Sequence, residues 1–236
     1  MPTRKPPAPR RQPTSTETIV ARITNALVEQ RLPPGTKLGE VALGVVFGVS
    51  RTKIRQALIR LSQDKLVTLL PARGAFVTKP EPRDARELFD ARRVIERVLI
   101  ERFTASATRA QITTLREHTA RERAAITAGD AALRNRLLGE FHVLIAEMVG
   151  NSVIAELLRE LMQRSTLVTL HYQNARAASC SSAEHTALLD AVRQRDAIAA
   201  VRLMEQHLTH VEQDLALPGS NVAVLDLRAA LTLAKV

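Results

Sequence analysis

Several side chains that can bind nucleic acid gather at the start of one predicted helix. Arg51 and Arg55 lie one helical turn apart, directly after Ser50, which is a good N-cap residue. An arginine can bond guanine with two hydrogen bonds, and the amide group of Gln56 can bond adenine. Phosphates could be held by the helix N-terminus and by the neighbouring side chains of Ser50, Thr52 and Lys53. This set predicts a helix that lies in the major groove of duplex DNA.

A further arginine stands at the tip of a predicted β-hairpin. The strand-like runs Val67–Leu70 and Ala75–Thr78 flank the turn sequence Pro71-Ala72-Arg73-Gly74. An arginine on such a tip can enter a narrow minor groove, which attracts cations. We therefore expect Arg73 and Gly74 to lie in a DNA-binding wing.

Three histidines, His142, His185 and His207, each lie beside apolar residues on a different predicted helix. Imidazole is a common metal ligand, but a lone histidine at such a position is more often a satisfied core or boundary residue. The chain has neither an HExxH motif nor a pair of cysteines. Spacing alone therefore leaves both interpretations open.

The elements that position the basic side chains are predicted within residues 16–79. A first helix with apolar residues at helical spacing ends before Leu32-Pro33-Pro34-Gly35. A second helix is expected from about Glu40 to Phe47. The third begins after Ser50 and has an inward-facing stripe of Ile54, Ala57, Leu58 and Leu61. Three helices and a hairpin wing predict a winged helix-turn-helix.

The remainder of the chain is predicted to be an all-α bundle, so the fold class is mainly α. After a linker at residues 80–83, turn-like breaks divide residues 84–217 into about six helices. Residues 1–15 are expected to form a disordered basic arm, and residues 218–236 a C-terminal extension with a short helix.

The positive charge of the chain is confined to its front third. Residues 1–79 carry 14 Lys and Arg against 4 Asp and Glu, whereas residues 80–236 carry 20 of each. The formal net charge of +10 therefore belongs to the first segment, which predicts a polyanion-binding head on a neutral body. Aromatic residues make up only 3% of the chain, which argues against binding single strands by base stacking.

Composition also indicates the cellular compartment. Cys180 is the single cysteine, so no intramolecular disulfide can form and a reducing compartment fits. There is no run of 18 apolar residues that would predict a membrane span, and the N-terminus has no apolar core of a secretory signal. We expect a cytoplasmic protein.

Residues 16–79 resemble the DNA-binding head of the GntR family of bacterial transcription regulators. The resemblance rests on Leu32-Pro33-Pro34-Gly35, on the stretch from Gly48 to Leu61, and on Arg73-Gly74-Ala75-Phe76-Val77. It implies that DNA is faced by Ser50, Arg51, Thr52, Arg55 and Gln56, with Arg73 and Gly74 in the wing. Lys53 stands where many members have proline and adds one possible phosphate contact. The second helix is more apolar than usual, so we expect it to be covered by a neighbour or locally soft.

Residues 84–215 resemble the FCD effector domain of the FadR-type subfamily of GntR regulators. The matching stretches are Leu88–Glu96, Phe141-His142 with Gly150-Asn151, Glu184-His185 with Leu188–Ala191, and His207-Leu208. The resemblance implies that His142, His185 and His207 bind a divalent metal ion, usually Zn²⁺. An aspartate one turn before His142 usually adds a fourth ligand, but here that position is Leu138.

The same resemblance implies that one arginine of the pair Arg92 and Arg93 points toward the effector cavity. The alternative is an ion pair with Glu96 within the helix. His118, His171 and His210 have no matching role, and we expect them at the surface or at the edge of the core.

Together these features predict a ligand-responsive transcription regulator and not an enzyme. We expect a homodimeric repressor that binds a palindromic operator and responds to a small organic acid. Two alternatives are a metal-dependent hydrolase with a fused DNA-binding head and an architectural protein that binds DNA without sequence choice.

Overall fold

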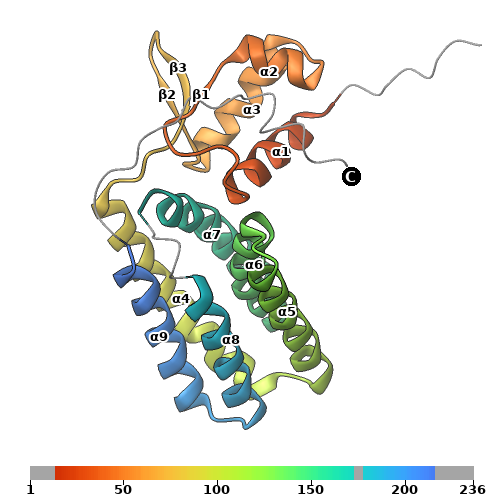
Figure 1. The fold of residues 1–236 in the computed structure, drawn as a ribbon, viewed down its shortest axis with the longest axis vertical. Helices are drawn as coiled ribbons and strands as arrows, with labels where there is room; N and C mark the ends of the chain where they lie inside the picture. Colours follow the sequence, from red (N-terminus) through yellow and green to blue (C-terminus); the bar gives the residue numbers. More distant parts are fainter. Residues whose placement is uncertain (1–13, 173–177, 216–236) are drawn as a thin grey trace, which may run out of the picture.

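The computed structural model describes residues 14–172 and 178–215. The predicted C-terminal extension and nearly all of the predicted basic arm lie outside the described residues. A head that contains the three β-strands stands on a bundle of helices (Figure 1). The predicted mainly α fold, with an N-terminal winged helix-turn-helix and a C-terminal helical body, is confirmed. No helix in the described ranges combines the length and apolar character that a membrane span requires.

The head contains three helices and a small antiparallel sheet. Its helices are α1 (Thr16–Val28), α2 (Glu40–Phe47) and α3 (Arg51–Gln63). Strands β2 (Val67–Leu70) and β3 (Gly74–Val77) form the predicted hairpin, and β1 (Lys37–Leu38) pairs with the other edge of β3. Strand β1 was not predicted, because two residues are too few to show an alternating pattern.

The turn between α2 and α3 fixes the start of the predicted recognition helix. Gly48 ends α2 in the left-handed conformation, with φ +65°, which a residue without a Cβ adopts without strain. The Ser50 hydroxyl then accepts a hydrogen bond from the Lys53 N–H at 3.4 Å, as predicted for an N-cap. The expected cover for α2 is not found among the described residues, since Val41 and Val45 are 61% and 70% exposed.

The body contains six helices within the described ranges. They are α4 (Pro82–Ser106), α5 (Arg109–Thr127), α6 (Ala131–Val149), α7 (Ser152–Tyr172), α8 (Ala178–Arg193) and α9 (Ala197–Gln213). Helix α4 begins two residues before the predicted start of the bundle, because Glu81 and Asp84 form a capping box and Pro82 fits the first helical turn. The predicted linker is correspondingly shorter.

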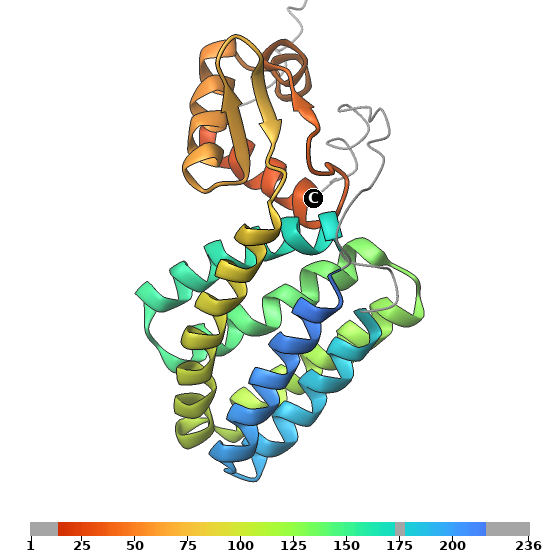
Figure 2. The same cartoon turned by 90° about the vertical axis from the view of Figure 1, so that its left-hand side faces the viewer.

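The helices of the body enclose one large apolar core. Helices α8 and α9 lie side by side, and α9 also packs along α4 (Figure 2). Fully buried side chains from all six helices fill the interior, among them Ile100, Leu115, Phe141, Leu158, Leu188 and Leu208. This packing brings buried polar residues from all six helices to the middle of the bundle, among them Glu96, Glu122, His142, Ser165, His185 and His207.

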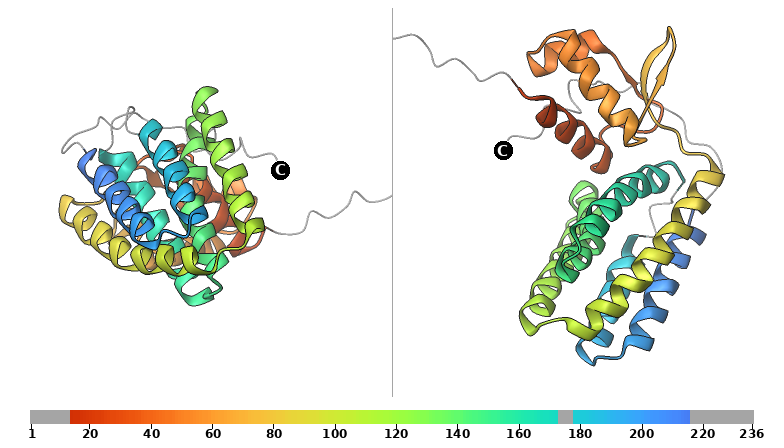
Figure 3. Two further views of the ribbon diagram at one scale, coloured as in Figure 1. Left: turned by 90° about the horizontal axis from the view of Figure 1, so that it is seen from below. Right: turned by 180° about the vertical axis from the view of Figure 1, so that it is seen from behind.

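The head rests on α7 of the body. Helix α1 lies above α7 when the molecule is seen from behind (Figure 3). Leu167 of α7 is only 2% exposed and belongs to the apolar core of the head, together with residues such as Ile23 and Leu27. Head and body therefore share a hydrophobic contact as well as a linker.

Candidate functional site

The predicted DNA-contacting side chains form an exposed basic edge on α3. The side chains of Arg51 and Arg55 are 69% and 64% exposed. Thr52 and Gln56 are also exposed, because the apolar stripe of α3 faces inward and leaves this side to solvent. Lys53 is only half-exposed, and its ammonium group donates to the Thr14 carbonyl oxygen at 3.2 Å.

The wing residues are positioned by the hairpin between β2 and β3. Leu70 pairs with Gly74, and Gly74 has φ +97°, which closes the turn without strain on a side chain. Arg73 is exposed, and its guanidinium carbon lies 5.9 Å from the centre of the Phe76 ring. The arginine thus has an aromatic support at the tip of the wing.

Both arginines of α3 also contact a carboxylate that the sequence analysis did not single out. Glu40, the first residue of α2, accepts hydrogen bonds from Nε and Nη2 of Arg55 at 3.0 and 3.1 Å. Its Oε2 lies 3.5 Å from Nη2 of Arg51. The two guanidinium groups remain exposed in spite of these contacts, so they are paired and still accessible.

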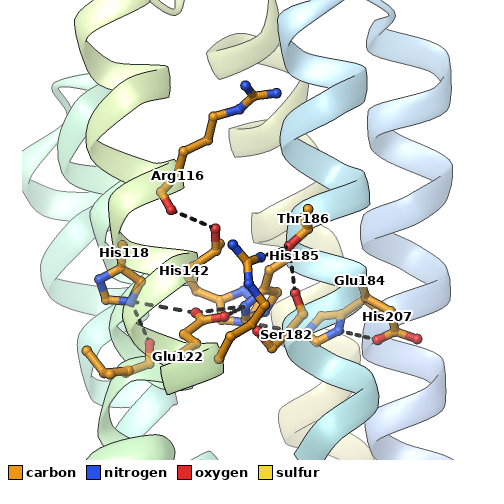
Figure 4. A network of polar contacts seen from close by, with 12 residues as sticks. Arg116, His118, Glu122, His142, Ser182, Glu184, His185, Thr186 and His207 are labelled. Atoms are coloured by element: carbon orange, nitrogen blue, oxygen red, sulfur yellow. Dashed lines mark hydrogen bonds and ion pairs between the residues drawn. The ribbon is translucent and has the colours of Figure 1, made fainter. Parts of the chain in front are cut away.

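The three predicted histidines meet at the centre of the body. His142 comes from α6, His185 from α8 and His207 from α9, and one ligand atom of each lies within 4.8 Å of the others. All three are buried, with exposures of 0–3%. Figure 4 shows the three rings grouped between the helices. The Phe141 ring stacks on His185 at 3.9 Å between centroids and fixes the plane of that imidazole.

Each histidine is oriented by a glutamate that contacts its Nδ1 atom. His142 contacts Glu96 of α4, His185 contacts Glu122 of α5 at 3.0 Å, and His207 contacts Glu184 of α8 at 2.7 Å (Figure 4 labels Glu122 and Glu184). Each carboxylate accepts a hydrogen bond from the Nδ1–H group, so the neutral ring has its free lone pair on Nε2. This is the arrangement that carboxylates give to metal-ligating histidines.

The Nε2 atoms are arranged as a cation site would require. The Nε2 atoms of His142 and His207 lie 3.3 Å apart, although both carry lone pairs when Nδ1 is protonated. Nε2 of His185 is buried and has no hydrogen-bond partner among the described residues. A buried polar atom without a partner is costly, and a metal ion would satisfy all three nitrogens at once. The residues therefore fit a metal ion.

Burial prepares the protonation states of the cluster. It lowers the pKa of His207 to about 4 and lowers the pKa of His142 and, most strongly, of His185. Burial would raise the pKa of Glu96, but the charge of Arg92 and the contact with His142 outweigh it, so that pKa is lowered. Burial raises the pKa of Glu122 to about 7. Neutral imidazoles, which bind metal, are the form present near neutral pH.

A cavity of about 70 Å³ opens beside the histidines. Arg92 lines it and is 2% exposed, with Nε donating to Glu96 at 2.7 Å and Nη1 donating to Ser165 at 2.9 Å. Arg92 thus satisfies both expectations, the ion pair and the position at the cavity. Arg93 instead pairs with Asp90 and Glu212, away from the cavity lining. Leu138, at the position of the usual acid, also lines this cavity.

One further histidine differs from its prediction. His118 was expected at the surface or core edge, but it is 4% exposed and its Nε2 lies 2.8 Å from the Leu137 carbonyl oxygen. The burial of His118 and the contacts of the three orienting glutamates depend on how separate helices pack. Glu184 was the glutamate that the sequence could most easily have suggested, because it directly precedes His185.

Comparison with known proteins agrees with this fold. The FCD domain matches residues 87–210, and the bacterial regulatory proteins of the gntR family match residues 15–77. The FCD match alone covers more than half of the chain. The chain therefore belongs to the GntR family of bacterial transcription regulators, and it combines a DNA-binding head with an FCD effector-binding domain.

Two curated relatives are similar to this chain over most of their length. The HTH-type transcriptional repressor RspR of Escherichia coli K12 is 26% identical over 192 residues, 80% of this chain and 83% of the relative. The Uxu operon transcriptional regulator of the same organism is 29% identical over 213 residues, 82% of this chain and 80% of the relative. A putative GntR regulator from Rhodococcus sp. RHA1 has the same fold, with a TM-score of 0.77 and 24% identity over 84% of this chain and 95% of that one.

Proposed function

We propose that this regulator reads a specific operator through the exposed arginines of α3. The observation that carries the proposal is the pair Arg51 and Arg55, both exposed at the capped start of a helix that follows a tight turn. These arginines would contact base edges, while Arg73 and Gly74 of the wing reach the minor groove. Ser50, Thr52, Lys53 and Gln56 would complete the contacts to phosphates and bases.

The quaternary structure that we propose is a homodimer on a palindromic operator. Residues 16–79 would act as the DNA-binding unit and residues 84–217 as the effector and dimer unit. Two heads related by a two-fold axis need two half-sites with matching symmetry. We propose that the protein represses transcription, since one relative is named a transcriptional repressor. Such a protein would act in the cytoplasm, where bacterial DNA lies.

A divalent metal ion, with Zn²⁺ as the first choice, is the cofactor that we propose for the histidine cluster. His142, His185 and His207 would hold it through Nε2, and their glutamates would keep the rings in place. When bound, a metal ion with three protein ligands supplies a positive charge and an open position for a ligand oxygen. Each nearby glutamate already bonds a histidine, so the cluster gives no support to the hydrolase alternative.

The effector that we propose is a small carboxylate bound beside this cluster. Arg92 supplies a buried guanidinium at the cavity, and hydroxyl and amide groups line the rest of it, those of Ser165, Thr166, Thr169, Ser181 and Asn135. Arg93 is withdrawn from the proposed effector contacts. The effector would bind two arrangements of the head with different affinities, and it would thereby change the affinity of the protein for DNA.

The test of sequence-specific binding is the variant Arg51→Ala. We expect it to lose about 1–3 kcal/mol of affinity for the selected operator, because a bidentate arginine–guanine contact is lost. The control is Arg60→Ala, which removes the same charge from the exposed C-terminal end of α3. Mobility shift of full-length protein at fixed salt, on operator and on random duplex, measures both. Unchanged operator affinity in Arg51→Ala would falsify this assignment.

A further inference from the structure

Glu40 holds the arginine pair from the side that faces the protein. It is the first residue of α2, and its side chain is 25% exposed, less than half as much as either arginine. A carboxylate at this position is also stabilised by the N-terminal end of the helix dipole. Glu40 is therefore fixed by its own helix while it contacts side chains of the next one.

The contact with Arg55 uses only part of the guanidinium group. Nε donates to Oε1 and Nη2 donates to Oε2, the two-point geometry that arginine and carboxylate prefer. This pairing occupies the Nε edge and leaves Nη1, with the second proton of Nη2, for another acceptor. Those are the donors with which an arginine bonds O6 and N7 of guanine end-on.

We propose that Glu40 is a positioning residue for base recognition, which orients Arg55 and, through Oε2, Arg51 toward the edges of the bases. The proposal rests on the proposed function, because it assumes that these arginines contact DNA. An unrestrained arginine loses side-chain entropy when it is ordered. An arginine that is already held in place loses less on binding, so base contacts gain in strength.

The same carboxylate has an electrostatic cost. Its negative charge lies next to the surface that meets phosphates, so it weakens binding to any duplex, whatever its sequence. This cost lowers the affinities for operator and for random duplex by the same factor. Glu40 therefore raises the ratio of specific to random affinity only by orienting the arginines, which strengthens base contacts on the operator. A residue that only stabilised α2 would change the two affinities together.

The experiment uses full-length protein and a duplex selected by the wild-type chain from a random-sequence library. Affinities for this duplex and for a shuffled duplex are measured at the same salt concentration. Glu40→Gln is expected to lower the ratio of the two affinities about tenfold, as expected for one weakened base contact. Its affinity for shuffled DNA is expected to rise, with a salt slope steeper by about 1.

A matched control separates this effect from charge and helix capping. Glu17 is the acidic residue in the first turn of α1, and Glu17→Gln removes the same charge from an equivalent helix position. It is expected to leave the ratio within about twofold of the wild-type value. Glu40→Asp keeps the charge but shortens the side chain, so it is expected to lower the ratio without raising affinity for shuffled DNA.

The double variant Glu40→Gln/Arg55→Ala decides whether Glu40 acts through Arg55. We expect its ratio to lie below that of Arg55→Ala by much less than tenfold, because only the longer contact with Arg51, at 3.5 Å, is then left to lose. A further tenfold drop in the double variant, equal to that of Glu40→Gln alone, would overturn the proposal. A wild-type ratio in both Glu40→Gln and Glu40→Asp, while Arg55→Ala is defective, would also overturn it. A wild-type ratio in Arg55→Ala itself would instead reject the DNA contact of Arg55, and thus that part of the proposed function.

Discussion

Each histidine of the central cluster faces two different environments through its two ring nitrogens. Nδ1 is directed to a glutamate, and Nε2 is directed to the shared space between the rings. Burial keeps the rings neutral, because it lowers the pKa of all three imidazoles. A cluster of neutral rings with outward carboxylates is suited to a cation and poorly suited to protons.

Metal content is the first prediction at the residue scale. His142→Ala is expected to lower bound zinc from about one ion per chain to a small fraction, because two imidazoles hold a metal much less firmly than three. The control is His171→Ala, on the half-exposed end of α7. Elemental analysis after equilibration with zinc and dialysis measures both variants. Equal zinc in His142→Ala and the parent would remove His142 from the ligand set.

The stability of metal-free protein should fall in mild acid. The pKa of His207 is lowered to about 4 in the fold, against 6.5 for an unperturbed imidazole. As the pH falls below 6.5, the unfolded chain binds a proton at this residue and the folded chain does not, so stability is lost down to about pH 4. The loss from His207 alone is roughly 3 kcal/mol. His142 and His185 act in the same direction.

Glu122 opposes this trend in part. Its pKa is raised to about 7, so below pH 7 the folded chain binds a proton that the unfolded chain lacks until about pH 4.5, and stability is gained as the pH falls. Three histidines outweigh one glutamate, and we expect a net loss. Urea unfolding of EDTA-treated protein at about pH 7 and pH 5 measures the difference. Equal or greater stability at pH 5 contradicts the prediction.

At the scale of the elements, the short turn between α2 and α3 determines where the recognition helix points. Gly48 has φ +65° and ψ +37° and ends α2 through an N–H bond to the Gly44 carbonyl oxygen. Two residues later Ser50 caps α3, so the arginines follow the turn at a fixed distance. The placement of the arginines on α3 therefore depends on the backbone conformation of one glycine.

Gly48→Ala tests this dependence. We expect it to destabilise the protein by about 1 kcal/mol, because an alanine Cβ is unfavourable in the left-handed conformation. The control is Gly139→Ala within α6, where the added Cβ would meet only the Met162 methyl at 3.6 Å. That change should be neutral or stabilising. The measurement is the free energy of unfolding of each variant. Equal values for Gly48→Ala and Gly139→Ala would show that the turn tolerates a side chain.

At the scale of the whole molecule, the head and the histidine cavity are separated by one layer of residues. Asn135, Gly139, Met162 and Thr166 line the histidine cavity and also line a cleft of about 230 Å³ against Thr24, Asn25 and Val28 of α1. Leu167 lies on the same helix as two of these residues and enters the core of the head. Changes at the histidine cavity therefore have a short physical route to α1.

Leu167→Ala tests the mechanical link between head and body. Truncation of a leucine that is 2% exposed should cost about 2–4 kcal/mol, because it leaves a cavity in the head core. We also expect head and body to unfold in two separate transitions. Leu157→Ala on the same helix is the control, since Leu157 is 45% exposed. Calorimetry that gives one unchanged transition for Leu167→Ala would show that the contact does not couple the two parts.

Local patterns predicted much of the architecture. The positions of the helices, the Gly48 turn, the Ser50 cap and the hairpin follow from apolar spacing and turn residues within about ten positions of one another. The start of α4 and the two-residue strand β1 were missed, because a capping box and a short edge strand leave little trace in a pattern. The capping box is local but uses Glu81 and Asp84 where Ser or Thr with Glu or Gln is the usual pair, whereas β1 depends on pairing with the distant strand β3.

The sequence by itself determined the helix-turn-helix with its basic face, since side-chain chemistry and helical period are local properties. The same holds for the three histidines as candidates, although their proximity was only implied by resemblance. Tertiary structure alone decided that Glu96, Glu122 and Glu184 orient the rings, that Arg92 and not Arg93 lines the cavity, and that Glu40 holds Arg51 and Arg55. Most of these contacts join residues on separate helices, so they arise from the way in which the helices pack and not from the spacing along any one of them.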